Sequence, residues 1–271
     1  MKENRGIKIW GGILLTIILL SVFSNLFTSY SPVDVNLGKV FMQPSKNHIL
    51  GTDNMGRDVY TRIIYGGRVS LSVSILAVLI STIIGVLFGG ISGYIGGWFD
   101  SFMMRILDAL LAIPSLIIML ALQAIIKGGV VSMILVIGFT GWMSTARIVR
   151  SQFIELKEKE FVKAAVILGT PSWRIMLDHL LRNSLSGIFV IAIFNCAHAV
   201  FTEVSLSFLG IGIPPQIPSW GNMLSNAQND ILIGAWWVAL FPGIMIVISM
   251  LSINFLGESL KNKFGLQGGI N

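Results

Sequence analysis

Apolar residues gather in six long runs, and polar or turn-rich stretches separate them. A helix that crosses a membrane needs about 20 mostly apolar residues, because each residue adds about 1.5 Å of length. Six runs meet this requirement; they cover about 9–28, 70–97, 102–126, 130–149, 186–209 and 233–256. The pattern predicts an all-α integral membrane protein with six transmembrane helices.

Composition supports a membrane protein and argues against other classes. The chain has 271 residues, of which 54% are hydrophobic and 12% are charged, whereas soluble domains carry about 25% charged residues. The net charge of +6 does not indicate nucleic-acid binding, because Lys and Arg gather at the ends of apolar runs and form no basic stripe with aromatics. The single cysteine, Cys196, excludes an internal disulfide.

Basic residues also predict the orientation. Lys2, Arg5 and Lys8 precede the first run, so we place the N-terminus in the cytoplasm, and six spans return the C-terminus to the same side. The first run exceeds the roughly 7–15 apolar residues of a signal peptide, so we expect a retained helix. Residues 29–68 would form a long outer loop; the alternative is that they lie along the membrane surface.

Four glycines, each four positions apart, lie in the second run: Gly85, Gly89, Gly93 and Gly97. On a helix they form one smooth stripe that lets another helix approach closely. Static helix packing is the favoured interpretation; the alternative is a helix that slides or rocks in a transport cycle.

Three residues interrupt the apolar character of the later runs. Pro114 cannot continue the backbone hydrogen bonds, so a kink is expected there. Glu203 is a carboxylate inside an apolar helix, which indicates either a functional site or a hydrogen bond that ties helices together. His198, five residues earlier, fits a packed neutral histidine better.

The stretch between the fourth and fifth runs, about 150–185, is charged and amphipathic. Gly169 is expected to end a first helix, with Thr170 as the cap and Pro171 as the first residue of a second. An apolar side of that second helix would consist of Trp173, Met176, Leu177, Leu180 and Leu181. This helix–turn–helix either docks onto a soluble partner or rests on the bilayer surface.

Residues 210–222 are rich in Gly and Pro and cannot continue a helix. We expect this segment to cap the outer mouth of the bundle or to re-enter it shallowly. Trp220, Trp236 and Trp237 suit the membrane interface.

Motifs for catalysis or nucleotide binding are missing from the sequence. There is no phosphate-binding loop of the Gly-x-x-x-x-Gly-Lys type and no His-Glu-x-x-His zinc motif. His48, His179 and His198 lie in three different segments, so we expect no tight metal site. The chain is therefore predicted to be neither an enzyme nor an ATP-binding protein.

Several motifs together resemble one known family. Residues 161–169 with His179-Leu180 are similar to the cytoplasmic "EAA" loop of ABC importer permeases. Four further stretches resemble the dipeptide, oligopeptide and nickel permeases of that family: 48–58 with 64–68, 108–114, 203–212 and 218–224. The resemblance runs from about 48 to 260 and points to the second of two permease subunits.

The resemblance implies a type I ABC importer permease fold in the cell membrane. It divides the chain into an N-terminal helix with an external loop (1–65), a permease core of five helices (66–260) and a cytoplasmic tail (261–271). It implies a homologous second permease, two cytoplasmic ATPases that hold ATP and Mg, and an extracytoplasmic substrate-binding protein. The residues expected to couple to the ATPase are Phe161, Lys163, Ala164, Ala165, Gly169, Trp173 and His179. The candidates for the pore or gate are Glu203, Pro114 and Asn222.

Two departures from the family pattern concern this coupling loop. Lys163 stands where the name of the loop has Glu, and Arg182 stands where a proline commonly follows. The expected cargo is a peptide or a related small solute; the alternative is nickel or a metal–chelator complex. An intramembrane enzyme and a membrane scaffold are the competing classes, and the absent catalytic pairs and the matching motifs argue against them.

Overall fold

A computed structural model describes residues 2–126 and 128–265, and this part of the chain is helical, apart from loops and one isolated bridge between Thr52 and Asp58. The all-α prediction is confirmed. The helices are α1 (Lys2–Val22), α2 (Ser24–Phe27), η1 (Leu37–Lys39), α3 (Val59–Ile95), α4 (Gly97–Leu111), α5 (Ser115–Ile126), α6 (Val130–Lys157), α7 (Glu160–Ile167), α8 (Ser172–Arg174), η2 (Ile175–Leu181), α9 (Arg182–Phe208), α10 (Trp220–Asp230), η3 (Ile231–Ile233) and α11 (Trp237–Lys263).

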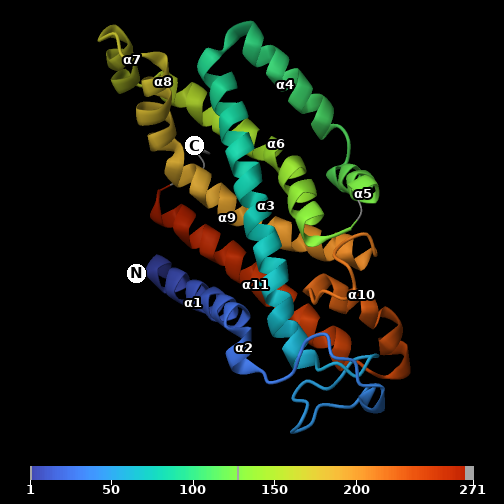
Figure 1. Cartoon of the computed structure of the whole chain (residues 1–271). Coiled ribbons are helices and arrows are strands. Elements are labelled where there is room, and N and C mark those ends of the chain that lie inside the picture. The colour runs from blue at the N-terminus through green and yellow to red at the C-terminus, as the bar shows by residue number, and fades with distance from the viewer. Residues whose placement is uncertain (1, 127, 266–271) are drawn as a thin grey trace.

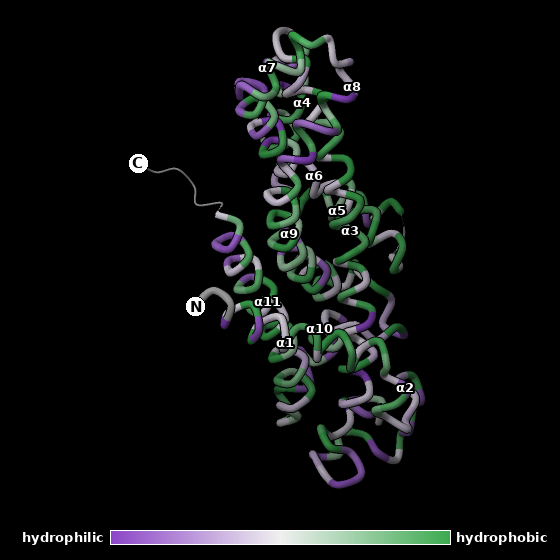
Figure 2. The backbone as a smooth tube through the Cα atoms, turned by 90° about the vertical axis from the view of Figure 1, so that its left-hand side faces the viewer, coloured by the Kyte–Doolittle hydropathy of each residue, from purple (hydrophilic) through white to green (hydrophobic). Residues whose placement is uncertain are grey.

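Five continuous helical stretches of the described chain are long and apolar enough to cross a membrane: α1, α3, α6, α8 to α9, and α11. A sixth crossing results if the bent pair α4–α5 is counted as one span. Figure 2 shows that hydrophobic residues run through these helices and that hydrophilic residues gather near both ends of the molecule. The boundaries differ from the expected ones, since α3 already begins at Val59 and the fifth span is continuous from Ser172.

Helix α3 is the central element, and its largest contact is with α6 (Figure 1). Gly85, Gly89 and Gly93 face the α6 backbone so closely that a β-carbon on Gly89 would overlap the carbonyl of Ala146. The glycine stripe therefore serves close packing of α3 on α6. Gly97 does not belong to the stripe: it has a φ of +60° and opens α4, with no neighbour within 4 Å of a β-carbon placed on it.

The third apolar run is broken rather than a single helix from 102 to 126. Helices α4 and α5 meet at an angle of 79° around Pro114, whose ring fixes φ and removes a backbone donor. Two ion pairs join α4 to α6: Asp100 with Arg150, and Asp108 with Arg147.

The segment between α2 and α3 is a compact cap on one end of the bundle, not an extended outer loop. The Asp58 side chain caps α3 by accepting a 2.8 Å hydrogen bond from the Thr61 amide, and it contacts His48 at 2.9 Å. The Trp237 indole N–H donates to the Thr52 carbonyl at 3.0 Å, which ties this cap to α11. Residues 59–68, expected in the loop, are the first turns of α3.

The two terminal helices pack against each other on one flank of the bundle (Figure 1). Trp10 of α1 stacks on Phe255 of α11 with ring centroids 4.6 Å apart. Gly6 faces Ser259, so the beginning of α1 lies beside the last turns of α11. Both described chain ends are therefore on the same side of the membrane bundle, as an even number of crossings requires.

Candidate functional site

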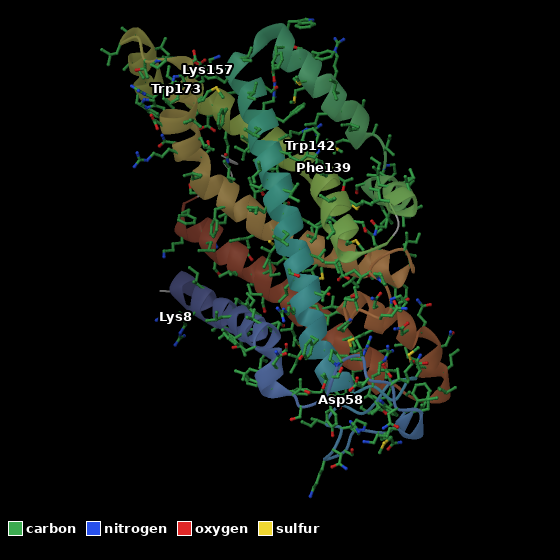
Figure 3. The ribbon with its side chains drawn as sticks, in the orientation of Figure 1. Lys8, Asp58, Phe139, Trp142, Lys157 and Trp173 are labelled. Carbon is green, nitrogen blue, oxygen red and sulfur yellow. The ribbon has the colours of Figure 1, made fainter. Side chains whose placement is uncertain are left out.

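Helix α7 lies at the end of the molecule opposite the cap, as the positions of Trp173 and Asp58 show (Figure 3). It ends in a Schellman motif: the Thr170 amide donates to the Ala165 carbonyl and the Gly169 amide to the Val166 carbonyl, both at 3.0 Å. Gly169 takes a φ of +75°, which favours glycine. The predicted helix end at Gly169 is therefore correct in place and in mechanism.

The start of the next helix differs in detail from the expectation. Ser172 is the first residue of α8, Pro171 occupies the N-cap position, and no side chain caps this end. Thr170 is therefore not the cap, because its amide already closes the preceding helix. The helix then continues through the π-helical turn η2 into α9 without a break, so the loop runs directly into the fifth span.

The π-helical turn changes which side of this helix is covered. In a π-helix hydrogen bonds join residues five apart, and the buried pair here is Ile175 and Leu180, with 2% and 0% of their surface exposed. The expected apolar face, based on the α-helical period, included Trp173 and Leu177. Both of these side chains are exposed instead.

The inner face of α7 packs on its own bundle. Val162 and Ala165 are buried in one cluster with Phe153 of α6 and with Ile175 and Leu180. Ala165 was expected, with Gly169, among the residues that couple to the ATPase. Ala165 instead points into the bundle, while Gly169 lies beyond the helix end.

Large apolar side chains remain exposed around α7, and we call this surface the apolar tip. Ile167 and Leu168 are each 84% exposed. The apolar tip consists of Phe161, Val166, Ile167, Leu168, Trp173 and Leu177. In a membrane protein, exposed apolar surface of this kind is covered either by lipid or by a partner protein.

Polar groups border the apolar tip. Lys163 forms an ion pair with Glu158 at 3.2 Å, and Arg174 lies over the Trp173 ring at 5.2 Å from its centroid. His179 is half-buried, with its ring 6.3 Å from that of Phe161. Ala164 is exposed beside Lys163. A charged rim around an apolar centre is typical of a protein-docking surface.

A cavity of about 340 Å³ lies among α3, α6, α9 and the break between α4 and α5. Pro114 and His198 line it, as do several hydrogen-bonding side chains that the sequence analysis did not select: Ser81, Thr140, Ser144 and Asn195. His198 was expected to be a packed histidine, but its side chain is exposed at the cavity wall. Asn195 and His198 are polar residues three positions apart within an apolar run, and this spacing was the sequence signal that could have indicated the cavity wall.

Glu203 does not line that cavity; it is completely buried where three helices meet. Ser70 of α3 donates to one carboxylate oxygen at 2.8 Å, and Ser207 of α9 donates to the other at 3.0 Å. The Trp220 amide at the start of α10 donates to the Ser70 hydroxyl at 3.2 Å. One carboxylate therefore joins α3, α9 and α10.

Asn222 closes the turn-rich segment that precedes α10. Its side-chain amide donates to the carbonyls of Pro214 at 2.9 Å and Ile217 at 3.0 Å, so it holds the segment against the helix. The Ser219 side chain caps α10 by accepting a hydrogen bond from the backbone amide of Asn222. Asn222 is buried and lies away from the cavity wall.

The tryptophans expected at the membrane interface divide into two kinds. Trp236 is half exposed. Trp220 is fully buried and donates its indole N–H to the Ile63 carbonyl at 2.9 Å, and Trp237 is buried against the cap. The indole N–H groups of Trp220 and Trp237 donate hydrogen bonds inside the protein, so these side chains can be buried.

Within residues 2–126 and 128–265, no group of three or more His, Cys, Asp or Glu side chains comes together in a way that could hold a metal ion. His48 lies in the cap, His179 at the apolar tip and His198 at the cavity.

The fold is a bundle of membrane-length helices with a cavity among them and exposed apolar surface at one end, which is the architecture of a polytopic membrane protein. Residues 85–264 match the family described as "Binding-protein-dependent transport system inner membrane component", and the chain belongs to this family. It is an ABC transporter permease, a transport component and not an enzyme.

Relatives of known name are of similar size. The chain is 37% identical over 205 residues to the oligopeptide transport system permease protein OppC of Bacillus subtilis. This match covers 76% of this chain and 67% of the relative. It is 39% identical over 213 residues to the dipeptide transport system permease protein DppC of the same organism, and this match covers 79% of this chain and 67% of the relative. DppC of Alkalihalophilus pseudofirmus is 38% identical over 213 residues, with 78% and 70% covered.

Proposed function

We propose that this chain forms one half of the membrane pore of an ATP-driven importer for peptides or related small solutes. It would pair with a homologous permease, and an extracytoplasmic binding protein would deliver the cargo. Two cytoplasmic ATPase subunits, holding ATP and Mg, would supply the energy. The peptide names of the relatives support this choice of cargo.

The observation that carries the coupling role is the apolar tip. Leu168 and Ile167 are almost fully exposed at the end of a short helix whose other face is buried. The charged rim, with Glu158, Lys163 and Arg174, suits an aqueous protein surface better than lipid. We therefore place the apolar tip in the cytoplasm against an ATPase subunit, with both chain termini on the same side.

The packing suggests how movement at the apolar tip would reach the cavity. Val162 of α7 shares a buried cluster with Phe153 of α6 and Leu180 of η2, so these elements move as one body. Helix η2 continues into α9, which carries His198 and Glu203. Closure of the ATPases would thus be passed to α9 through η2, a rigid-body change at a packed interface.

Glu203 would act as a latch in this cycle rather than as a contact for a cationic cargo. Its carboxylate is fully enclosed and its two oxygens accept from Ser70 and Ser207. A latch of this kind would hold α3, α9 and α10 together near the outer end of the bundle. Pro114, at the cavity, would allow α4 and α5 to change their angle.

Two measurements test the proposed function. The complex should be isolated in mild detergent with an ATPase and a second permease; a stable homodimer without other subunits would contradict the proposal. A strain that lacks this chain should lose uptake of labelled peptide and regain it on complementation. Loss of uptake of nickel, free or chelated, with peptide uptake unchanged would overturn the peptide cargo.

A further inference from the structure

The wall of the 340 Å³ cavity carries no formal charge from Asp, Glu, Lys or Arg among the described residues. This matters because a fixed charge at 4 Å from an oppositely charged group contributes about 4 kcal/mol at an effective dielectric constant of 20. Such a contact would hold some peptides and repel others. A transport path needs contacts weak enough for the cargo to leave.

The wall instead offers uncharged hydrogen-bonding groups, and several of them have a free acceptor. The hydroxyls of Ser81 and Thr140 donate to carbonyls of their own helices, at 3.0 and 2.6 Å, so their hydrogens are used and their oxygens remain as acceptors. The Asn195 amide nitrogen donates to the Thr145 hydroxyl at 3.0 Å, which leaves the side-chain oxygen of Asn195 as an acceptor.

His198 adds a further acceptor. The Thr202 hydroxyl donates its single hydrogen to the His198 carbonyl at 2.8 Å. The same hydroxyl lies 3.4 Å from Nδ1 of His198, and we assign Nδ1–H as the donor of this contact because the hydroxyl hydrogen is already used. In that tautomer Nε2 carries the free lone pair, and it has no hydrogen-bond partner in the described part of the chain.

We infer that His198 and Asn195 accept hydrogen bonds from main-chain amide N–H groups of a peptide in this cavity. The two residues lie three positions apart and so share one face of α9. Main-chain donors are common to all peptides, so an uncharged wall of acceptors admits peptides irrespective of side-chain charge. This inference rests on the proposed function of peptide import and adds the residues that meet the cargo.

The test uses the complete transporter in proteoliposomes, with its binding protein and ATP. The variants are His198→Phe, which keeps a ring and removes the acceptor, and His198→Gln, which keeps an acceptor. Ser205→Ala is the matched control, because Ser205 is an exposed α9 residue that bonds to its own helix and lies outside the cavity. The probe peptides are trialanine, its N-methylated form without amide N–H groups, Lys-Ala-Ala and Glu-Ala-Ala.

We expect His198→Phe to lower kcat/KM for trialanine about five- to tenfold, the effect of one neutral hydrogen bond. His198→Gln should restore most of it, and Ser205→Ala should match wild type. The decrease should be equal for the three peptides of different charge and should be much smaller for the N-methylated peptide. Selection by the binding protein is common to all complexes and cancels in this comparison. Cargo-independent ATP hydrolysis should not change.

Three results would overturn the inference. Trialanine uptake by His198→Phe within twofold of wild type would show that the acceptor is not used. A decrease confined to the peptide of one charge would indicate charge selection instead, and an equal decrease for the N-methylated peptide would exclude a role for N–H groups. Absence of peptide import by the wild-type complex would instead refute the proposed function, and this inference with it.

Discussion

The Ser70 hydroxyl donates a 2.8 Å hydrogen bond to the carboxylate of Glu203, although the two residues are 133 positions apart in the chain. Ser70 in turn accepts a hydrogen bond from the Trp220 amide. A buried carboxylate is stable only when its oxygens are hydrogen-bonded. This contact therefore explains how an acidic residue is accommodated in an otherwise apolar helix.

Substitutions of Glu203 separate a latch from a charge contact. Glu203→Gln keeps size and hydrogen bonding, and the Ser207 hydroxyl can turn to accept from the new amide, so we expect near-normal peptide uptake. Glu203→Ala leaves the hydroxyl hydrogens of Ser70 and Ser207 without their acceptor, at about 1–3 kcal/mol for each group, so we expect a lower unfolding temperature in detergent and lost uptake. Failure of both variants would indicate a charge contact, and wild-type behaviour of Glu203→Ala would exclude both roles.

Close packing of α3 on α6 predicts that Gly89 tolerates no side chain. Gly89→Val should lower thermal stability by about 1–3 kcal/mol or prevent assembly, because the β-carbon would overlap the Ala146 carbonyl. Gly12→Ala in α1 is the matched control, since a β-carbon there meets nothing within 4 Å. Equal stability of the two variants, measured by thermal unfolding of the purified protein, would contradict the packing argument.

The apolar tip can be tested apart from the fold beneath it. Leu168→Asp changes an exposed residue, so we expect normal folding and membrane insertion with loss of ATPase attachment and of uptake. Ala165→Asp places a charge in the buried cluster instead and should destabilise the protein by on the order of 3 kcal/mol. Retained ATPase binding by Leu168→Asp in a pull-down would favour a helix that only rests on the bilayer.

Gly169 is predicted to be sensitive to backbone conformation and not to size alone. Gly169→Val should lose uptake, because a β-branched residue at a φ of +75° costs about 1–2 kcal/mol and would reorient the apolar tip. Gly169→Asn should be tolerated far better, because asparagine adopts this conformation more readily. If the two variants transport equally in whole cells, the Schellman motif is not needed for coupling.

The α10 residue Asp230 gives a pH-dependent prediction. Burial, and secondarily the charge of Asp53, raise the pKa of the Asp230 carboxyl above its usual value. The folded state then binds the proton more tightly than the unfolded state, so this residue makes stability fall as pH rises from the unfolded pKa through the folded pKa. Asp230→Asn should therefore raise the unfolding temperature at pH 7, with a gain that shrinks toward pH 4. A gain of the same size at both pH values would refute this.

Local sequence patterns were enough for most of the element types. The apolar runs predicted the helical bundle, Pro114 the place where α4 and α5 bend, and Gly169 the end of α7. Motifs between about residues 48 and 260 also predicted the family, which the match over residues 85–264 confirms. These features depend on neighbouring residues and on backbone chemistry, which the sequence states directly.

Other features followed from contacts that no local pattern contains. In the π-helical turn, the buried side chains are Ile175 and Leu180 rather than Trp173 and Leu177. Gly97 has a positive φ and lies outside α3, so it does not continue the glycine stripe. The hydrogen-bonding partners of Glu203 lie on α3 and α9, and the wall that includes His198 forms only where α3, α5, α6 and α9 meet.

The sequence by itself thus determined that this protein is a helical membrane protein, because hydrophobicity and helix-ending residues act locally, and its motifs resembled the permease family to which it belongs. Only the tertiary structure decided that Ala165 faces inward, that Trp220 is buried and that His198 faces a cavity. Each side of a membrane helix faces either lipid or another helix, and both environments favour the same apolar residues. Which side meets which neighbour is fixed by packing between distant segments.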